Sequence, residues 1–150
     1  MKKIALIPGT FDPITIGHLE LVKFASAIFD EVVVCICINP EKKHLFDEKT
    51  RKERIEKAVL CYPNVRVDTH HGMTADYAVS IGAEYIVRGI RNEKDAKYEL
   101  EMADFNRNYR GIRTLLVPAS AEIAEISSTL VREKLSRGEC VDHLIPENVQ

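Results

Sequence analysis

The stretch Gly9-Thr10-Phe11-Asp12-Pro13-Ile14-Thr15-Ile16-Gly17-His18 decides the fold prediction, because it joins two different periodic patterns. It follows the apolar run Ile4-Ala5-Leu6-Ile7 and precedes a stretch of helical periodicity. A buried strand that ends in a Gly/Pro turn and continues as a helix can hold a phosphate, since the first N–H groups of a helix are unpaired and carry the positive end of its dipole. Gly9 and Gly17 let the backbone approach such a ligand closely. The segment therefore predicts an anion site with His18 beside it.

The length and charge of the chain limit the classes of function. A chain of 150 residues predicts one domain, residues 1–150, which buries roughly 70% of the surface of the unfolded chain. The net charge of −2, from 21 basic and 23 acidic residues, produces no field that would favour nucleic acid or an anionic membrane. The longest apolar run, Val32 to Ile38, has seven residues and is too short to span a bilayer. We therefore expect neither nucleic acid nor a membrane as a partner.

The N-terminus and the cysteines predict a cytoplasmic protein. Met1-Lys2-Lys3 leads directly into a predicted strand, without the apolar region and cleavage site of a signal peptide. The four cysteines have no zinc-finger spacing, and they are interpreted as small core residues in a reducing compartment: Cys35, Cys37, Cys61 and Cys140.

Short segments rich in β-branched residues alternate with helical patterns along the chain. The strands predicted from this pattern show little polar alternation, as is typical of strands buried on both faces of a parallel sheet: residues 3–8, 32–38, 65–69, 84–88 and 113–117. The predicted helices cover residues 17–29, a stretch after residue 50, 74–81 with Gly82 at its end, 93–109, and Ser127-Ser128 to Gly138. Five such units predict an α/β fold with a doubly wound five-stranded parallel sheet, which binds ligands outside the carboxyl ends of its strands.

Two of these helices carry more detailed expectations. The periodicity of residues 17–29 places Leu21, Val22, Ala25, Ile28 and Phe29 on one apolar face. The next helix is expected to open with a capping box at Thr50-Arg51-Lys52-Glu53.

Polar residues gather after the predicted strands, where the ligand site of such a sheet is expected. After the first strand come Thr10 to His18, after the second Asn39-Pro40-Glu41-Lys42-Lys43, after the fourth Arg88-Gly89-Ile90-Arg91, and before the last helix Ile126-Ser127-Ser128-Thr129. Fixed cations and hydroxyls at one edge of a slightly acidic protein favour a polyphosphate ligand. The lysine pair could instead be an ordinary solvated loop, and the three hydroxyls could serve only as a helix cap.

Several well-known motifs are absent from the sequence. It contains no Gly-x4-Gly-Lys-Ser/Thr, no Gly-x-Gly-x-x-Gly in the first turn, no Gly-x-Ser-x-Gly, and no cysteine in the setting of a nucleophile. A site rich in cations and poor in nucleophiles suits direct transfer between phosphates, since an ionised phosphate attacks without a general base.

Gly9-Thr10-Phe11-Asp12-Pro13 followed by Thr15-Ile16-Gly17-His18 resembles the first signature of the nucleotidyltransferase superfamily, and Ile126-Ser127-Ser128-Thr129-Leu130-Val131-Arg132 resembles the second. Within that group the chain is similar to bacterial phosphopantetheine adenylyltransferases over nearly its whole length. The resemblance rests on Ile7-Pro8-Gly9, Pro40-Glu41-Lys42-Lys43, Arg88-Gly89-Ile90-Arg91, Tyr98-Glu99, Asn106-Arg107 and Leu144-Ile145-Pro146-Glu147-Asn148-Val149. It implies a Rossmann-like nucleotidyltransferase fold.

The resemblance also implies an activity: transfer of the adenylyl group of ATP to 4′-phosphopantetheine, which yields 3′-dephospho-coenzyme A and pyrophosphate, with Mg²⁺ carried by ATP. It implies a cytoplasmic homohexamer with coenzyme A as a feedback ligand. The catalytic residues it implies are Thr10, His18, Lys42 and Arg91, and the acceptor contacts are Thr10, Lys42, Thr74 and Arg88. The implied ATP contacts are Thr10, Phe11, His18, Gly89, Ile90, Arg91, Glu99, Ala124, Glu125, Ile126, Ser127, Ser128, Thr129 and Leu130. No metal ligand on the protein is implied.

The chain departs from the family pattern at several positions. Asp95-Ala96-Lys97-Tyr98-Glu99 stands where relatives read Asp-Phe-Glu-Tyr-Glu, Ile123 replaces an aromatic residue, and Ala124-Glu125 is unusual. Thr74 stands where relatives are commonly apolar, and Gln150 ends the chain where they usually continue. Two other functions stay open: a sister nucleotidyltransferase acting on nicotinate mononucleotide or glycerol 3-phosphate, and a non-catalytic sensor of ATP or coenzyme A.

Overall fold

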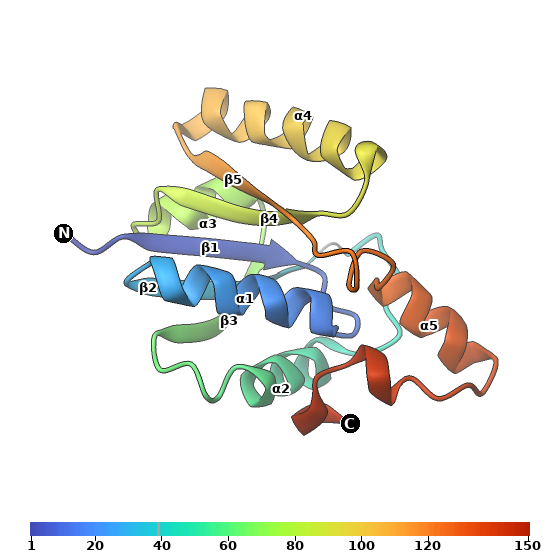
Figure 1. Cartoon of the computed structure of the whole chain (residues 1–150). Helices are drawn as coiled ribbons and strands as arrows, with labels where there is room; N and C mark the ends of the chain where they lie inside the picture. Colours follow the sequence, from blue (N-terminus) through green and yellow to red (C-terminus); the bar gives the residue numbers. More distant parts are fainter. Residues whose placement is uncertain (39) are drawn as a thin grey trace.

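The computed structural model describes residues 1–38 and 40–150, so Asn39 lies outside the described residues. Within these ranges, five parallel strands form one sheet in the order β3-β2-β1-β4-β5 (Figure 1). Every strand boundary lies within two residues of its predicted position, and the predicted doubly wound sheet is confirmed. The strands are β1 (Ile4–Gly9), β2 (Glu31–Ile38), β3 (Val65–His71), β4 (Tyr85–Ile90) and β5 (Arg113–Pro118).

Helices cover both faces of the sheet. The helices are α1 (Ile16–Ile28), α2 (Glu48–Ala58), α3 (Thr74–Ser80), α4 (Glu93–Arg110) and α5 (Ser128–Ser136), followed by the 3₁₀ turns η1 (Asp142–Leu144) and η2 (Glu147–Val149). In Figure 1, α1 and α2 lie on one face and α3 and α4 on the other, while α5 lies beyond the carboxyl end of β1. No helix in the described part of the chain is both long and apolar enough to cross a membrane.

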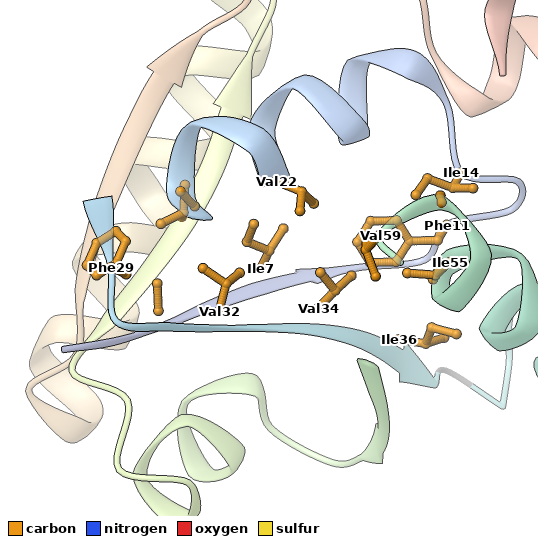
Figure 2. Packing of buried hydrophobic residues seen from close by; sticks show 14 residues of the cluster. Ile7, Phe11, Ile14, Val22, Phe29, Val32, Val34, Ile36, Ile55 and Val59 are labelled. Carbon is orange, nitrogen blue, oxygen red and sulfur yellow. The ribbon is translucent and has the colours of Figure 1, made fainter. Parts of the chain in front are cut away.

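The apolar runs of the central strands are explained by burial on both sides. On β1, Ala5 and Ile7 join a cluster with α1 and α2, whereas Leu6 points to a second cluster with α3. Figure 2 shows the first cluster, in which Phe11 lies with Ile55 and Val59. Since no side chain of such a strand faces water, no polar alternation is required.

The switch in strand order lies between β1 and β4. After β1, the chain builds the sheet outward through β2 and β3, then returns to the other side of β1 with β4 and β5. The pairing of β1 with β4 covers only Ala5 with Tyr85 and Leu6 with Ile86. The two strands then separate toward their carboxyl ends, which opens a crevice at the place where doubly wound sheets bind ligands.

The expected starts and ends of the helices are partly confirmed. Gly82 and Gly138 follow α3 and α5 with φ of +75° and +72°, which glycine adopts without strain. The predicted capping box at Thr50 is wrong, because α2 begins at Glu48 and the Asp47 carboxylate caps it by accepting from the Thr50 N–H at 2.7 Å. An aspartate three residues upstream competes with the threonine for the same role.

Two predictions about burial are also wrong. Ile28 at the last turn of α1 is 54% exposed, whereas the next residue, Phe29, is buried in the cluster with Val22 and Ala25. Cys61 and Cys140 are exposed and are not core residues, whereas Cys35 is buried in β2 as expected. All four thiols are free.

Candidate active site

A cleft of about 910 Å³ opens beyond the carboxyl ends of β1 and β4. Most of the residues predicted for the site line it: Thr10, Phe11, His18, Lys42, Thr74, Arg88, Gly89, Arg91, Glu99, Ile126, Ser127, Ser128 and Thr129. The predicted contacts Ile90, Ala124, Glu125 and Leu130 are not part of this lining. The structure therefore brings together side chains from five segments: those after β1, β2 and β3, the end of β4 with the residues after it, and the start of α5.

The turn after β1 is shaped by a buried phenyl ring. Phe11 has a φ of +50°, a left-handed conformation that a bulky side chain rarely adopts, and its side chain is buried. A Cβ on Gly9 would lie 3.0 Å from two carbons of this ring, so only glycine leaves room for it. The ring meets the imidazole of His18 edge-on at 4.9 Å between centroids. Gly9 and Phe11 thus set the position of His18.

A capping box fixes the tautomer of His18. Thr15 is the N-cap of α1, and its backbone N–H donates to His18 Nδ1 at 2.9 Å, while its hydroxyl accepts from the His18 N–H. A backbone N–H can only donate, so Nδ1 carries a lone pair and the proton of the neutral ring is on Nε2. His18 therefore presents an N–H donor to a ligand in the cleft.

The surroundings of His18 keep it neutral. Burial, followed by the guanidinium groups of Arg88 and Arg91, lowers the pKa of His18 to about 4. At neutral pH the free protein therefore holds a neutral imidazole, and its Nε2–H acts as a hydrogen-bond donor without carrying a full charge.

Asp12 of the first signature has a structural role. Its buried carboxylate accepts from the Leu45 N–H at 2.8 Å and from the Phe46 N–H at 2.9 Å. Arg51 of α2 donates to the carbonyls of Phe46 and Thr10, at 3.1 and 3.0 Å. These contacts tie the loop after β2, which carries Lys42, to the turn that carries Thr10.

Arg88 lies within β4 and donates hydrogen bonds to Glu99 and Pro8. Its Nε and Nη2 donate to the Glu99 carboxylate at 2.7 to 3.2 Å, and its Nη1 donates to the Pro8 carbonyl at 2.6 Å. Burial lowers the pKa of Arg88 and the Glu99 carboxylate raises it, with a net upward shift, so the group stays charged. Arg91, three residues on, pairs with Asp95 at 3.0 Å. Arg91 therefore follows β4 as the sequence predicts, whereas Arg88, expected at the end of the strand, lies inside it because the strand continues to Ile90.

The three hydroxyls at the start of α5 already have protein partners. Ser127 is the N-cap and accepts from the Leu130 N–H at 3.1 Å, and Ser128 donates to the Pro13 carbonyl at 2.7 Å. The hydroxyl of Thr129 accepts from Arg132 at 3.1 Å. Ser128 thus uses its O–H within the protein, whereas the hydroxyls of Ser127 and Thr129, which only accept in these contacts, keep an O–H donor for an anion beside the unpaired backbone N–H groups of the first turn.

Among the lining residues that the sequence did not predict for the site are Cys37 and Arg132. The thiol of Cys37 in β2 lies 3.6 Å from the Thr74 hydroxyl. The pKa of Cys37 is lowered to about 6 by the Cys35 thiol first, then by Thr74 and Arg88, although burial acts to raise it. Arg132 donates to the Asp12 carbonyl at 2.8 Å and lines the cleft beside α5. The position of Arg132 at the end of the second signature was a usable signal, whereas Cys37 looks like any other residue of an apolar strand.

Gly17 lets the loop before α5 pack on α1. A Cβ at this position would lie 3.1 Å from Ile123 Cγ2, closer than nearly all real contacts. Ile123 also lines the cleft, where relatives were expected to carry an aromatic residue.

The donor set of the cleft suits an anion. Among the described residues, no three His, Cys, Asp or Glu side chains are grouped so that they could hold a metal ion. The lining offers cations and N–H donors, which are groups that bind phosphate oxygens.

Comparisons with known proteins agree with this geometry. A family model described as cytidylyltransferase-like matches residues 6–134. The chain is 46% identical to the phosphopantetheine adenylyltransferase of Phocaeicola vulgatus, over 97% of each chain. It is 44% identical to that of Frankia alni, over 97% of this chain and 92% of the relative, and 42% identical to that of Porphyromonas gingivalis, over 97% and 95%.

A solved structure supports the fold. The crystal structure of the lipopolysaccharide core biosynthesis protein from Thermoplasma volcanium GSS1 matches with a TM-score of 0.57 and 23% identity, over 80% of this chain and 98% of that one. At this level of identity the likeness concerns the arrangement of strands and helices alone.

Proposed function

Since the chain belongs to the family of phosphopantetheine adenylyltransferases and catalyses their step of coenzyme A biosynthesis, transfer of the adenylyl group of ATP to 4′-phosphopantetheine, we propose that the acceptor phosphate attacks the α-phosphorus of ATP directly. The products are 3′-dephospho-coenzyme A and pyrophosphate. The proposal rests on the state of the His18 imidazole, which is neutral and accepts a hydrogen bond from the Thr15 N–H at Nδ1. Its Nε2–H is available in a cleft lined by Lys42, Arg88 and Arg91.

We assign the acceptor to the part of the cleft around Thr10, Lys42, Thr74 and Arg88. The phosphate of 4′-phosphopantetheine is already an ionised nucleophile, so the protein needs to neutralise and aim it. Lys42 and Arg88 supply the positive charge, and Thr10 supplies a hydroxyl beside His18. This assignment is supported by the common position of the four side chains in the cleft lining.

We assign ATP to the other part of the cleft, with Phe11 behind the nucleotide and the Nε2–H of His18 on the α-phosphate. Hydrogen bonding to the non-bridging oxygens becomes stronger as negative charge develops on them in the transition state, which lowers the barrier. Arg91 and the unpaired N–H groups at the start of α5 would then hold the leaving pyrophosphate. The remaining proposed ATP contacts are Gly89, Ile90, Glu99 and the segment Ala124-Glu125-Ile126-Ser127-Ser128-Thr129-Leu130.

Mg²⁺ is proposed to enter as the complex with ATP. The residues of the cleft fit this arrangement because they can neutralise phosphates but, among the described residues, do not form a carboxylate cage. When bound, the ion supplies additional neutralisation of the triphosphate.

We further propose that the 150 residues form one nucleotidyltransferase domain that assembles as a homohexamer in the cytoplasm, with coenzyme A as a feedback ligand. Assembly is supported by large apolar side chains of α4 that are exposed in the single chain, among them Leu100 at 59% and Phe105 at 45%. Feedback is supported by chemistry, because coenzyme A contains the phosphopantetheine chain of the acceptor. The free thiols are in keeping with a reducing compartment.

The test is pyrophosphate release from Mg-ATP with 4′-phosphopantetheine, nicotinate mononucleotide or glycerol 3-phosphate offered separately. We expect release with phosphopantetheine alone. Release with one of the other two acceptors would retain the superfamily and overturn the acceptor. The absence of pyrophosphate release with all three acceptors, together with measurable binding of ATP, would favour a nucleotide sensor.

A further inference from the structure

Glu99 is a buried carboxylate that is paired with Arg88. It lies on α4 with Met102, Ala103 and Asn106, at the spacing of one helix face, and all four line the cleft. The Glu99 side chain is only 7% exposed, and both of its oxygens accept hydrogen bonds from Arg88. Very little of this carboxylate is therefore left to contact a ligand.

The contacts of Arg88 leave a defined part of the guanidinium for the cleft. A guanidinium has five N–H groups, and Glu99 and Pro8 occupy three of them within the described part of the chain. The two that remain are on Nη1 and Nη2, one on each nitrogen. Two N–H groups on adjacent nitrogens match two oxygens of one phosphate.

From this geometry we infer that Glu99 is a positioning residue for the acceptor: it holds Arg88 with two N–H groups toward the acceptor phosphate. The inference rests on the proposed assignment of Arg88 to the acceptor. This positioning role is separate from the contact with ATP that the family resemblance implies for Glu99.

The physical reason is preorganisation. A free arginine side chain loses rotamer freedom when it binds a phosphate, and a fixed one has already lost it on folding. Arg88 is fixed at three of its N–H groups and extends from the last residues of a buried strand. An uncompensated carboxylate next to a phosphate site would repel the ligand, but a carboxylate paired with Arg88 does not add net negative charge to the cleft.

The test compares Glu99→Gln with the wild type in steady-state kinetics, and repeats the comparison in an Arg88→Ala background. Glutamine keeps the shape of the side chain but replaces one acceptor oxygen with a donor facing Arg88. We expect the KM for phosphopantetheine to rise at least about tenfold, and the KM for ATP to change less than about threefold. In the Arg88→Ala background, Glu99→Gln should not change the acceptor KM further, because Glu99 acts on the acceptor only through Arg88.

The matched control is Glu101→Gln, an exposed glutamate on the same helix, which should leave both KM values unchanged. If Glu99→Gln fails to fold, Glu99→Asp is measured instead, and it should raise the acceptor KM selectively but less. A rise in the ATP KM without a rise in the acceptor KM would overturn the inference, as would an equal effect of Glu99→Gln with and without Arg88. A wild type without transferase activity would refute the proposed function itself, which is a separate outcome.

Discussion

Replacing His18 with alanine removes one hydrogen-bond donor from the transition state and one acceptor from a helix cap. Loss of a single preorganised donor to developing charge costs about 10² to 10³ in kcat, equivalent to about 3 to 4 kcal/mol. Loss of the contact between His18 Nδ1 and the Thr15 N–H should lower the free energy of unfolding by about 1 kcal/mol. The Kd for ATP should change by less than about threefold, since the hydrogen bond strengthens only in the transition state.

The assay combines single-turnover pyrophosphate release, ATP binding by calorimetry and urea unfolding. The control is His18→Gln, because glutamine at the third position of a helix completes a capping box and restores the lost stability. The two variants should then differ in stability, and both should be slower than the wild type, with His18→Gln no slower than His18→Ala because its amide NH2 is still a donor. A parallel loss of ATP affinity and kcat would refute the assigned role of His18, because it would indicate that His18 binds the ground state as strongly as the transition state.

The pH dependence of kcat/KM follows from the same residue. The pKa of His18 is lowered to about 4 in the free protein, so the neutral form dominates above about pH 5 and kcat/KM should show no break attributable to His18 between pH 5 and 7. The unfolded chain binds the His18 proton at higher pH than the folded one, so this group reduces stability as the pH falls from about 6.5 toward 4. A loss of activity as pH rises through 6.5 would show that the imidazolium is the active form.

Three further predictions concern the rest of the cleft. Lys42→Ala should raise the acceptor KM about tenfold without lowering the unfolding temperature, because the side chain is exposed; a selective rise of the ATP KM would contradict its assignment. Asp12→Ala should lower the free energy of unfolding in urea by about 3 kcal/mol, because two hydrogen bonds to a buried carboxylate are lost; a change below about 0.5 kcal/mol would refute the structural role. Cys37, with its pKa lowered to about 6, should be alkylated by iodoacetamide at pH 7 faster than the exposed Cys61. Saturating phosphopantetheine should slow the alkylation of Cys37. Equal alkylation rates with and without the acceptor would place Cys37 away from the acceptor.

The sequence predicts the sheet and the location of the cleft because both depend on local patterns. Apolar runs such as Val32 to Ile38 identify buried strands. The carboxyl ends of parallel strands meet at one edge, so the amino-acid pattern alone indicates that the cations of separate loops lie close together. The same locality explains the ends of α3 and α5, where glycine follows the helix.

The contacts that hold the site depend on residues far apart in the chain, and these were not predictable. Asp12 looks like part of a turn, yet its partners are backbone groups 33 and 34 residues away. Arg88 looks free for a ligand, but Pro8 lies beside it only because β1 and β4 are neighbours. Asp47 and Thr50 are both candidates for the N-cap of α2, and only the geometry of the loop before the helix decides between them.

Attack by the acceptor phosphate on the α-phosphorus of ATP is tested most directly with phosphopantetheine carrying ¹⁸O in the oxygens of its phosphate. The wild-type protein is incubated with Mg-ATP and this acceptor, the products are separated, and the ¹⁸O content of each product is measured by mass spectrometry. Attack on the α-phosphorus leaves all of the label in dephospho-coenzyme A and none in pyrophosphate. Label in pyrophosphate, or formation of ADP in place of pyrophosphate, would contradict it.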